Sequence, residues 1–249
     1  MKRMNMKRTV LFIIGISLIM TTMAQQSYET DTFTTPDGKS VSITFIKHGT
    51  LMIRVNDSYT LHIDPVINLE PKSDYTRFSK ADLILVTHEH YDHYDTLAIK
   101  QITKSNTTLV TNERVARMQG YGKVMKNGDK ITIDGIELTA VAAYNITKGH
   151  TQFHPKGRDN GFVIAIGGLH IYVSGDTEDI PELKNLKGID IAFLSANQPY
   201  TMTPEQCIKA AKTFRPKILY PYHYGDTDVQ KIVEGLKGSG IEVRVRDLK

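Results

Sequence analysis

Apolar residues recur along the chain with two periods, which predict strands and helices in turn. Residues 41–46 alternate between apolar and polar side chains, as a half-buried strand does. Residues 83–86 form a short apolar run with β-branched members, which predicts a buried strand. Residues 95–103 and 203–214 carry apolar side chains at helical spacing, and each segment begins with a residue that can cap a helix.

The predicted elements form two halves, each with antiparallel strands followed by strand–helix units. Asp134-Gly135 and Gly167-Gly168 are turn pairs that join predicted strands into hairpins. No sequence repeat relates the two halves. The order of elements alone predicts a mixed α and β protein, with a single domain over residues 25–249.

Four potential metal ligands follow the predicted strand 83–86, within the run Thr-His-Glu-His-Tyr-Asp-His at 87–93. Alternate residues of an extended segment point the same way, so His88 and His90 can face one point. Asp92 and His93 need only a tight bend to face a second point nearby. Imidazole and carboxylate together suit zinc, manganese or iron. A polar surface loop is the simpler interpretation, but so dense a ligand set after a buried strand disfavours it.

Two further candidates lie where other predicted strands end. Gly175 permits a sharp turn that presents Asp176 after the strand 169–173, and His223 follows the strand 217–220. Together with Asp92 and His93, these are more ligands than one ion beside His88 and His90 needs. The sequence therefore predicts two divalent ions, with zinc preferred and manganese as the alternative.

The pattern His-x-His-x-Asp-His resembles the metal loop of the metallo-β-lactamase fold superfamily. The resemblance implies an α+β fold, a four-layer αββα sandwich with the metals along one edge. It also implies that Asp176, in Gly-Asp-Thr, is the bridging carboxylate and that His223, in Pro-Tyr-His-Tyr-Gly, is the final histidine ligand.

One position departs from the family pattern, which has a histidine between the metal loop and Asp176. The match by strand position is Asn145. His154 can take over as the ligand, His150 is a weaker candidate, and Asn145 itself remains open as a ligand or substrate contact. Asparagine is a poor zinc ligand but suits the harder manganese ion better.

Two residues can support the site from outside the ligand set. Asp64 follows the predicted strand 60–63 and matches an aspartate that backs the metal loop in the superfamily; a turn-capping aspartate is the alternative. His48 resembles a position lining the site in the lactonase-like branch, or it is a hydrogen-bonded structural histidine.

The predicted function is a metal-dependent hydrolase of an ester, lactone or phosphoester, with Asp92 and Asp176 in the catalytic centre and a metal-bound hydroxide as nucleophile. A non-hydrolytic periplasmic protein that binds metal or a ligand is the alternative. Oxidoreductases of the superfamily carry an acidic residue in place of His90, which disfavours a redox role.

The closest resemblance is to the L-ascorbate-6-phosphate lactonase-like branch. It is carried by Ala-Tyr-Asn at 143–145, His-Pro-Lys-Gly at 154–157, Tyr-Thr-Met-Thr at 200–203 and the Asp176 and His223 motifs. The likeness specifies a small-molecule substrate only as a class, because one fold hosts many chemistries. Lys156 and Arg158 either meet an anionic substrate or are solvated loop charges.

The first 24 residues read as a signal peptide, with a basic start, an apolar run at 10–20 and small residues before Gln25. A retained N-terminal anchor is the alternative. This segment carries four basic and no acidic residues, so the net charge of +4 falls to zero over residues 25–249. The sequence thus predicts a periplasmic or secreted protein, without a membrane span after processing and without affinity for nucleic acid.

Cys207 is the only cysteine, so no disulfide can form within the chain. It shares the apolar face of the predicted helix 203–214, where a buried thiol is expected and a catalytic thiol is not.

Overall fold

The computed structural model describes residues 28–249, and the predicted signal peptide at 1–24 lies outside them. Its fourteen described strands form two sheets of seven. In the first sheet the strands lie side by side in chain order, antiparallel from β1 to β4 and parallel from β4 to β7. These strands are β1 (Thr30–Thr34), β2 (Ser40–Lys47), β3 (Thr50–Val55), β4 (Tyr59–Ile63), β5 (Leu83–Val86), β6 (Thr108–Thr111) and β7 (Lys123–Val124).

The second sheet repeats this plan. Its strands also follow chain order, antiparallel from β8 to β11 and parallel from β11 to β14. They are β8 (Lys130–Ile133), β9 (Ile136–Ala143), β10 (Asp159–Ile166), β11 (Leu169–Val173), β12 (Ile191–Ser195), β13 (Ile218–Tyr222) and β14 (Glu242–Val243).

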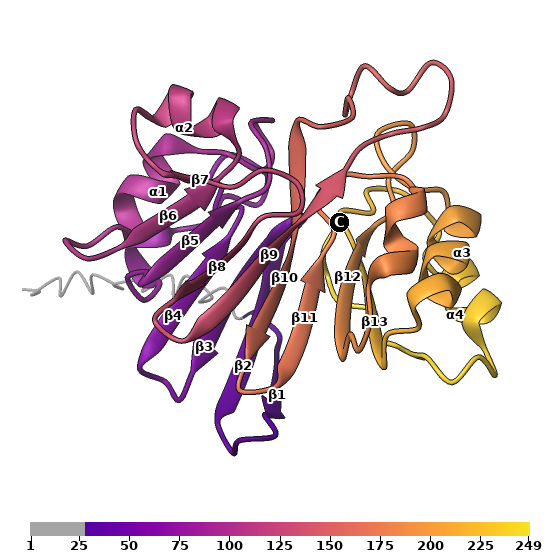
Figure 1. Cartoon of the computed structure of the whole chain (residues 1–249), viewed down its shortest axis with the longest axis horizontal. Helices are drawn as coiled ribbons and strands as arrows, with labels where there is room; N and C mark the ends of the chain where they lie inside the picture. The colour runs from indigo at the N-terminus through magenta and orange to yellow at the C-terminus, as the bar shows by residue number, and fades with distance from the viewer. Residues whose placement is uncertain (1–27) are drawn as a thin grey trace, which may run out of the picture.

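Helices cover the outer sides of the two sheets. Figure 1 shows α1 (Thr96–Ile102) and α2 (Glu113–Gln119) beside the first sheet, and α3 (Pro204–Phe214) and α4 (Gln230–Leu236) beside the second. Two short 3-10 turns complete the set, η1 (Tyr75–Arg77) and η2 (Pro181–Asn185). This arrangement is the αββα sandwich of the metallo-β-lactamase fold, so the predicted fold class is confirmed.

Strand β5 is apolar throughout because both of its faces are buried. Leu83 and Leu85 belong to the core between the two sheets, while Ile84 and Val86 belong to the cluster beneath the helices of the first half. Because side chains alternate across a strand, burying both faces requires every residue to be apolar. Across the sheet interface, the Phe45 ring of β2 lies 5.1 Å from the Tyr220 ring of β13.

The sequence pattern missed some strands and misplaced some boundaries. Strand β1 is absent from the prediction because its pattern, Thr-Asp-Thr-Phe-Thr, buries no residue fully. The predicted strand 162–166 begins earlier, at Asp159, and the strand 217–220 extends to Tyr222. The final strand covers only Glu242–Val243 rather than 242–245. Within residues 28–249, no helix has the length and apolar character to cross a bilayer.

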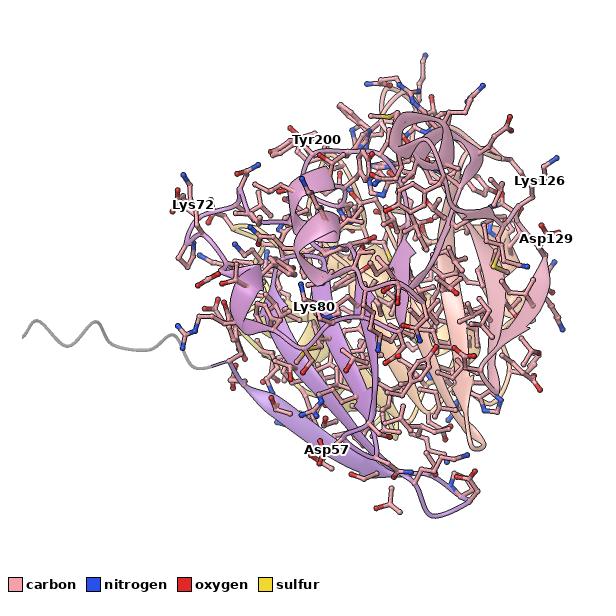
Figure 2. All side chains as sticks on the ribbon, turned by 90° about the vertical axis from the view of Figure 1, so that its left-hand side faces the viewer. Asp57, Lys72, Lys80, Lys126, Asp129 and Tyr200 are labelled. Atoms are coloured by element: carbon pink, nitrogen blue, oxygen red, sulfur yellow. The ribbon has the colours of Figure 1, made fainter. Side chains whose placement is uncertain are left out.

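The ends of several strands meet at one edge of the sandwich. Strands β4, β5, β11, β12 and β13 all finish there, and the long loop between β9 and β10 rises from the same edge (Figure 1). Figure 2 shows Tyr200, which follows β12, at this end of the molecule, whereas Asp57, in the turn between β3 and β4, lies at the opposite end.

Candidate metal centre

Eight ligand-type side chains gather at this edge in two groups of four. In each group, one atom from every side chain lies within 4.8 Å of the others. The first group is His88, His90, His154 and Asp176, and the second is His48, Asp92, His93 and His223. The two groups contain every ligand expected from the sequence, and they add His48.

Asp176 joins the first group to the second. Its Oδ2 atom lies 3.4 Å from His154 Nε2 and 3.9 Å from His88 Nε2. The same Oδ2 lies 3.3 Å from His223 Nε2, and Oδ1 lies 3.3 Å from His93 Nε2. A single carboxylate therefore reaches side chains of both groups, as a bridging ligand must.

Asp92 is the centre of the second group. Its Oδ2 atom lies 3.2 Å from His48 Nε2, 3.3 Å from His223 Nε2 and 3.9 Å from His93 Nε2. The rings of His48 and His223 are 3.7 Å apart at their centroids. His48 thus belongs to the second group and lines the pocket beside it.

Several nitrogen and oxygen atoms of the cluster that could bind a metal are buried without a hydrogen bond to any residue in the described part of the chain. They are the Nε2 atoms of His88, His93 and His154 and the Oδ1 atom of Asp176. Leaving a buried polar atom unpaired costs about 1–3 kcal/mol. Four such atoms converging on one place fit bound cations, and imidazole with carboxylate is the donor set that zinc and related divalent ions prefer.

Hydrogen bonds outside the cluster turn the histidine Nε2 atoms toward it. Asp64 Oδ2 accepts from His93 Nδ1 at 2.8 Å and from the Thr87 hydroxyl at 2.7 Å. Because that hydroxyl donates its only proton to Asp64, it accepts from His88 Nδ1 at 2.9 Å. The Nδ1 atoms of both rings then carry the protons, which leaves the Nε2 lone pairs free for a cation.

His154 and His48 are oriented in the same way. His154 Nδ1 lies 3.0 Å from Asp159 Oδ2, and His48 Nδ1 lies 2.9 Å from the main-chain oxygen of Lys249. Asp159 has no counterpart in the sequence prediction, because nothing in its local pattern separates it from an ordinary strand residue.

The backbone is strained where three of these side chains are presented. His48, Asp64 and His223 have φ angles of 45°, 46° and 49°, in the left-handed region that non-glycine residues rarely adopt. Each directly follows a strand end. Gly49 lets the main chain approach the cluster closely, since a Cβ atom there would lie 2.8 Å from His93 Cε1.

The charges of the cluster favour a cation. Burial alone would raise the pKa of Asp176, yet the imidazoles of His223 and His93 hold it well below its usual value. Burial and the neighbouring His93 ring lower the pKa of His88. Burial also lowers the pKa of His93, but the carboxylates of Asp176 and Asp92 outweigh it and raise that pKa well above normal. The carboxylates thus stay ionised and favour positive charge at the centre, which either a proton on His93 Nε2 or a bound cation in its place supplies.

Asn145 and His150 lie outside both groups. The Asn145 side-chain amide donates to the main-chain oxygens of Tyr200, at 2.7 Å, and His150, at 3.3 Å. The His150 ring lies 3.4 Å from Glu178 Oε1. The sequence offered His154, His150 and Asn145 at the position where the family pattern has a histidine. Of these three, only His154 lies in the cluster, while Asn145 connects the loops around it.

The cluster opens into a pocket of about 620 Å³. One part of its wall is apolar, with Leu69, Tyr91, Met118, Phe153 and Tyr200. Another part is charged, with Glu89, Arg114 and Arg158. Lys156, which was weighed with Arg158 as an anion contact, instead pairs with Glu182 at 2.9 Å.

Glu89 and Arg114 were missed at the sequence level. The position of Glu89 between His88 and His90 could have identified it. In an extended segment its side chain points to the opposite side from both imidazole rings. Nothing in the local pattern of Arg114 distinguishes it from other exposed helix residues.

The family model of the β-lactamase superfamily domain matches residues 42–223. Among curated relatives, a protein of Pelotomaculum thermopropionicum is 31% identical over 196 residues, covering 74% of this chain and 84% of its own length. A protein of Symbiobacterium thermophilum is 32% identical over 219 residues, covering 83% and 92%. Both are named UPF0173 metal-dependent hydrolases.

Two solved structures of metal-dependent hydrolases are also similar to this chain. A candidate metal-dependent hydrolase from Parabacteroides distasonis is 51% identical, with a TM-score of 0.86 over 90% of this chain and 100% of the other. Igni18, a metallo hydrolase from Ignicoccus hospitalis, is 26% identical, with a TM-score of 0.70 over 84% of this chain and 95% of its own.

Proposed function

We propose a reaction for a chain that belongs to the metallo-β-lactamase superfamily and, within it, to the UPF0173 metal-dependent hydrolases. Membership makes the protein an enzyme, a hydrolase that depends on metal. The proposed reaction is cleavage of an ester, lactone or phosphoester bond in a small molecule. The observation that carries it is the convergence of unpaired, buried histidine and aspartate atoms at the floor of a pocket.

The two groups of side chains would hold two divalent cations, zinc first and manganese as the alternative. His88, His90 and His154 would bind one, Asp92, His93 and His223 the other, and Asp176 both. When bound, such a pair supplies a hydroxide from water near neutral pH and polarises the bond to be cleaved. His48 is placed to orient Asp92, and Asp64 and Asp159 hold the rings of His93 and His154.

The makeup of the pocket supports hydrolysis by water rather than by a protein nucleophile. The described residues that line it include no serine, threonine or cysteine. The sole thiol, Cys207, is buried in α3. The resemblance to the L-ascorbate-6-phosphate lactonase-like branch makes lactones the first substrates to try.

Export completes the proposal. Residues 1–24 would direct the chain to the periplasm or the medium, where cleavage before Gln25 leaves the hydrolase domain. Cell fractionation and N-terminal sequencing of the protein from its native host test this step. A protein found in the cytosol with its first residues intact contradicts it.

The reaction is tested with Asp176→Asn, since Asp176 touches both groups. The matched control is Asp57→Asn, an exposed aspartate at the opposite end of the molecule (Figure 2). Metal content is measured by elemental analysis, and activity on panels of esters, lactones and phosphoesters with and without chelator. We expect Asp176→Asn and chelation to abolish activity and Asp57→Asn to leave it unchanged. Activity that responds to neither Asp176→Asn nor chelation would contradict metal-dependent hydrolysis at this site.

A further inference from the structure

We propose that Arg114 and Arg158 form a subsite for an oxyanion, a carboxylate or phosphate that the substrate carries away from the bond to be cleaved. This subsite deepens the proposed function and rests on it. Both arginines line the pocket, one from α2 and the other from the loop before β10.

Glu89 brings both guanidinium groups to one of its carboxylate oxygens. Its Oε1 atom lies 3.1 Å from Arg114 Nε and 3.4 Å from Arg158 Nη1. The Glu89 side chain is only 5% exposed, whereas that of Arg114 is 54% exposed. The carboxylate is thus buried behind the guanidinium groups and holds them in place, while Arg114 still reaches the solvent of the pocket.

The arginine side chains of this corner are accessible from the pocket, whereas the Glu89 oxygens are buried, although they accept no hydrogen bond from the described residues. The structure gives the terminal nitrogens of Arg114 no partner among residues 28–249. Arg158 uses Nε and Nη2 on Asp159 and the Phe153 main chain, which leaves Nη1 beside Glu89. Because the Glu89 oxygens are buried, a ligand that docks here must bring the acceptors itself. Paired guanidinium groups match the oxygens of a carboxylate or phosphate.

A chain of contacts links this corner to the metal centre. The Asp159 carboxylate accepts from Arg158 at 2.7 and 2.8 Å and lies 3.0 Å from His154 Nδ1. The subsite is therefore adjacent to the first ligand group, yet neither arginine belongs to either group. An oxyanion held here lies beside the centre, where the cleavable bond of the same molecule can reach the cations.

The apolar part of the wall defines the remainder of the substrate. Tyr91, Met118 and Tyr200 line the pocket and are 77%, 56% and 45% exposed. Phe153 packs against Tyr200 with ring centroids 5.0 Å apart. The substrate class is an anionic ester, lactone or phosphoester with an apolar or aromatic body.

The test compares ligands that differ in charge but share an aromatic body. Phenylacetate, benzylphosphonate and the neutral phenylacetamide are titrated into the metal-loaded protein by calorimetry. The variant is Arg114→Gln, and the matched control is Arg117→Gln, which removes a 73% exposed arginine one turn further along α2, outside the pocket. Thermal unfolding verifies that both variants fold.

We expect Arg114→Gln to weaken the anionic ligands about tenfold and leave phenylacetamide unchanged, while Arg117→Gln changes neither. Equal affinity in all three proteins means that the anions bind the metal ions only and overturns the subsite. Failure of the wild type to bind either anion overturns it as well. If the charge-selective loss occurs but no ester, lactone or phosphoester is cleaved, the subsite stands and the hydrolytic proposal falls.

Discussion

Asp64 Oδ2 lies 2.8 Å from Nδ1 of His93, and both side chains are fully buried beneath the candidate metal centre. The same carboxylate accepts from the main-chain nitrogen and the hydroxyl of Thr87. One residue therefore positions His93 directly and His88 through Thr87. Asp64 has no place in either ligand group itself.

We expect Asp64→Asn to weaken metal binding because an amide cannot accept from all three donors. Affinity should fall about 10–100-fold, the usual effect of removing a partner behind a metal ligand. Competition with a fluorescent chelator measures it. Asp82→Asn is the control, since Asp82 is a partly buried aspartate that pairs with Lys104 and the Thr60 main chain outside the site. Equal affinities in the two variants would show that Asp64 serves only the turn.

His154 and Asn145 can be distinguished by metal content. If the chain binds the two proposed ions, His154→Ala removes a ligand-type atom from the first group and should lower the metal content from two equivalents toward one. Asn145→Ala removes contacts to Tyr200 and His150 and should leave the metal content unchanged. Elemental analysis after gel filtration decides between them. The opposite result would restore Asn145 as the ligand.

Gly49→Ala should disturb the metal centre by a steric clash with His93, without removing any ligand atom. The added methyl would lie 2.8 Å from His93 Cε1, so the ring must move or the strand end must shift. Overpacking of this kind costs about 1–3 kcal/mol of unfolding free energy. We expect lower metal affinity together with a lower melting temperature.

Gly38→Ala is the control for Gly49→Ala. A Cβ atom at Gly38 meets nothing within 4 Å, but φ there is 86°, so the substitution strains the backbone without approaching the centre. It should lower stability and leave metal affinity intact. A Gly49→Ala protein with full metal affinity contradicts the close approach.

The thiol of Cys207 should be inert in the native protein. Burial raises its pKa to about 12, so almost no thiolate forms at pH 8, whereas the unfolded chain has an ordinary thiol. A colorimetric disulfide reagent should react with one thiol in denaturant and with none in buffer. Rapid reaction of the folded protein at pH 8 would show that the α3 helix opens readily.

The ligand positions in the chain could be predicted because sequence periodicity locates strand ends. His88, His90, Asp92 and His93 follow β5 directly, and a buried apolar strand is among the clearest sequence patterns. Asp176 and His223 follow β11 and β13 in the same way. In parallel strands such ends share one edge, so the residues after them meet in space.

The remaining contacts depend on tertiary structure. Arg158 lies near the metal loop only because the start of β10 runs beside it: the Asn160 main chain bonds the Thr87 oxygen. His48 contacts Asp92 from a left-handed backbone conformation. Local sequence does not predict this conformation, because histidine has no strong preference for it. The choice of His154 over Asn145 likewise depends on how a long loop folds back.

Each group of ligands draws on both sheets. His88 and His90 come from the first sheet and meet His154 and Asp176 from the second; His48, Asp92 and His93 meet His223. Half of the protein alone could assemble neither group. The full ligand set therefore exists only once the two halves have joined, and a cation held by residues of both would stabilise the joined state against their separation.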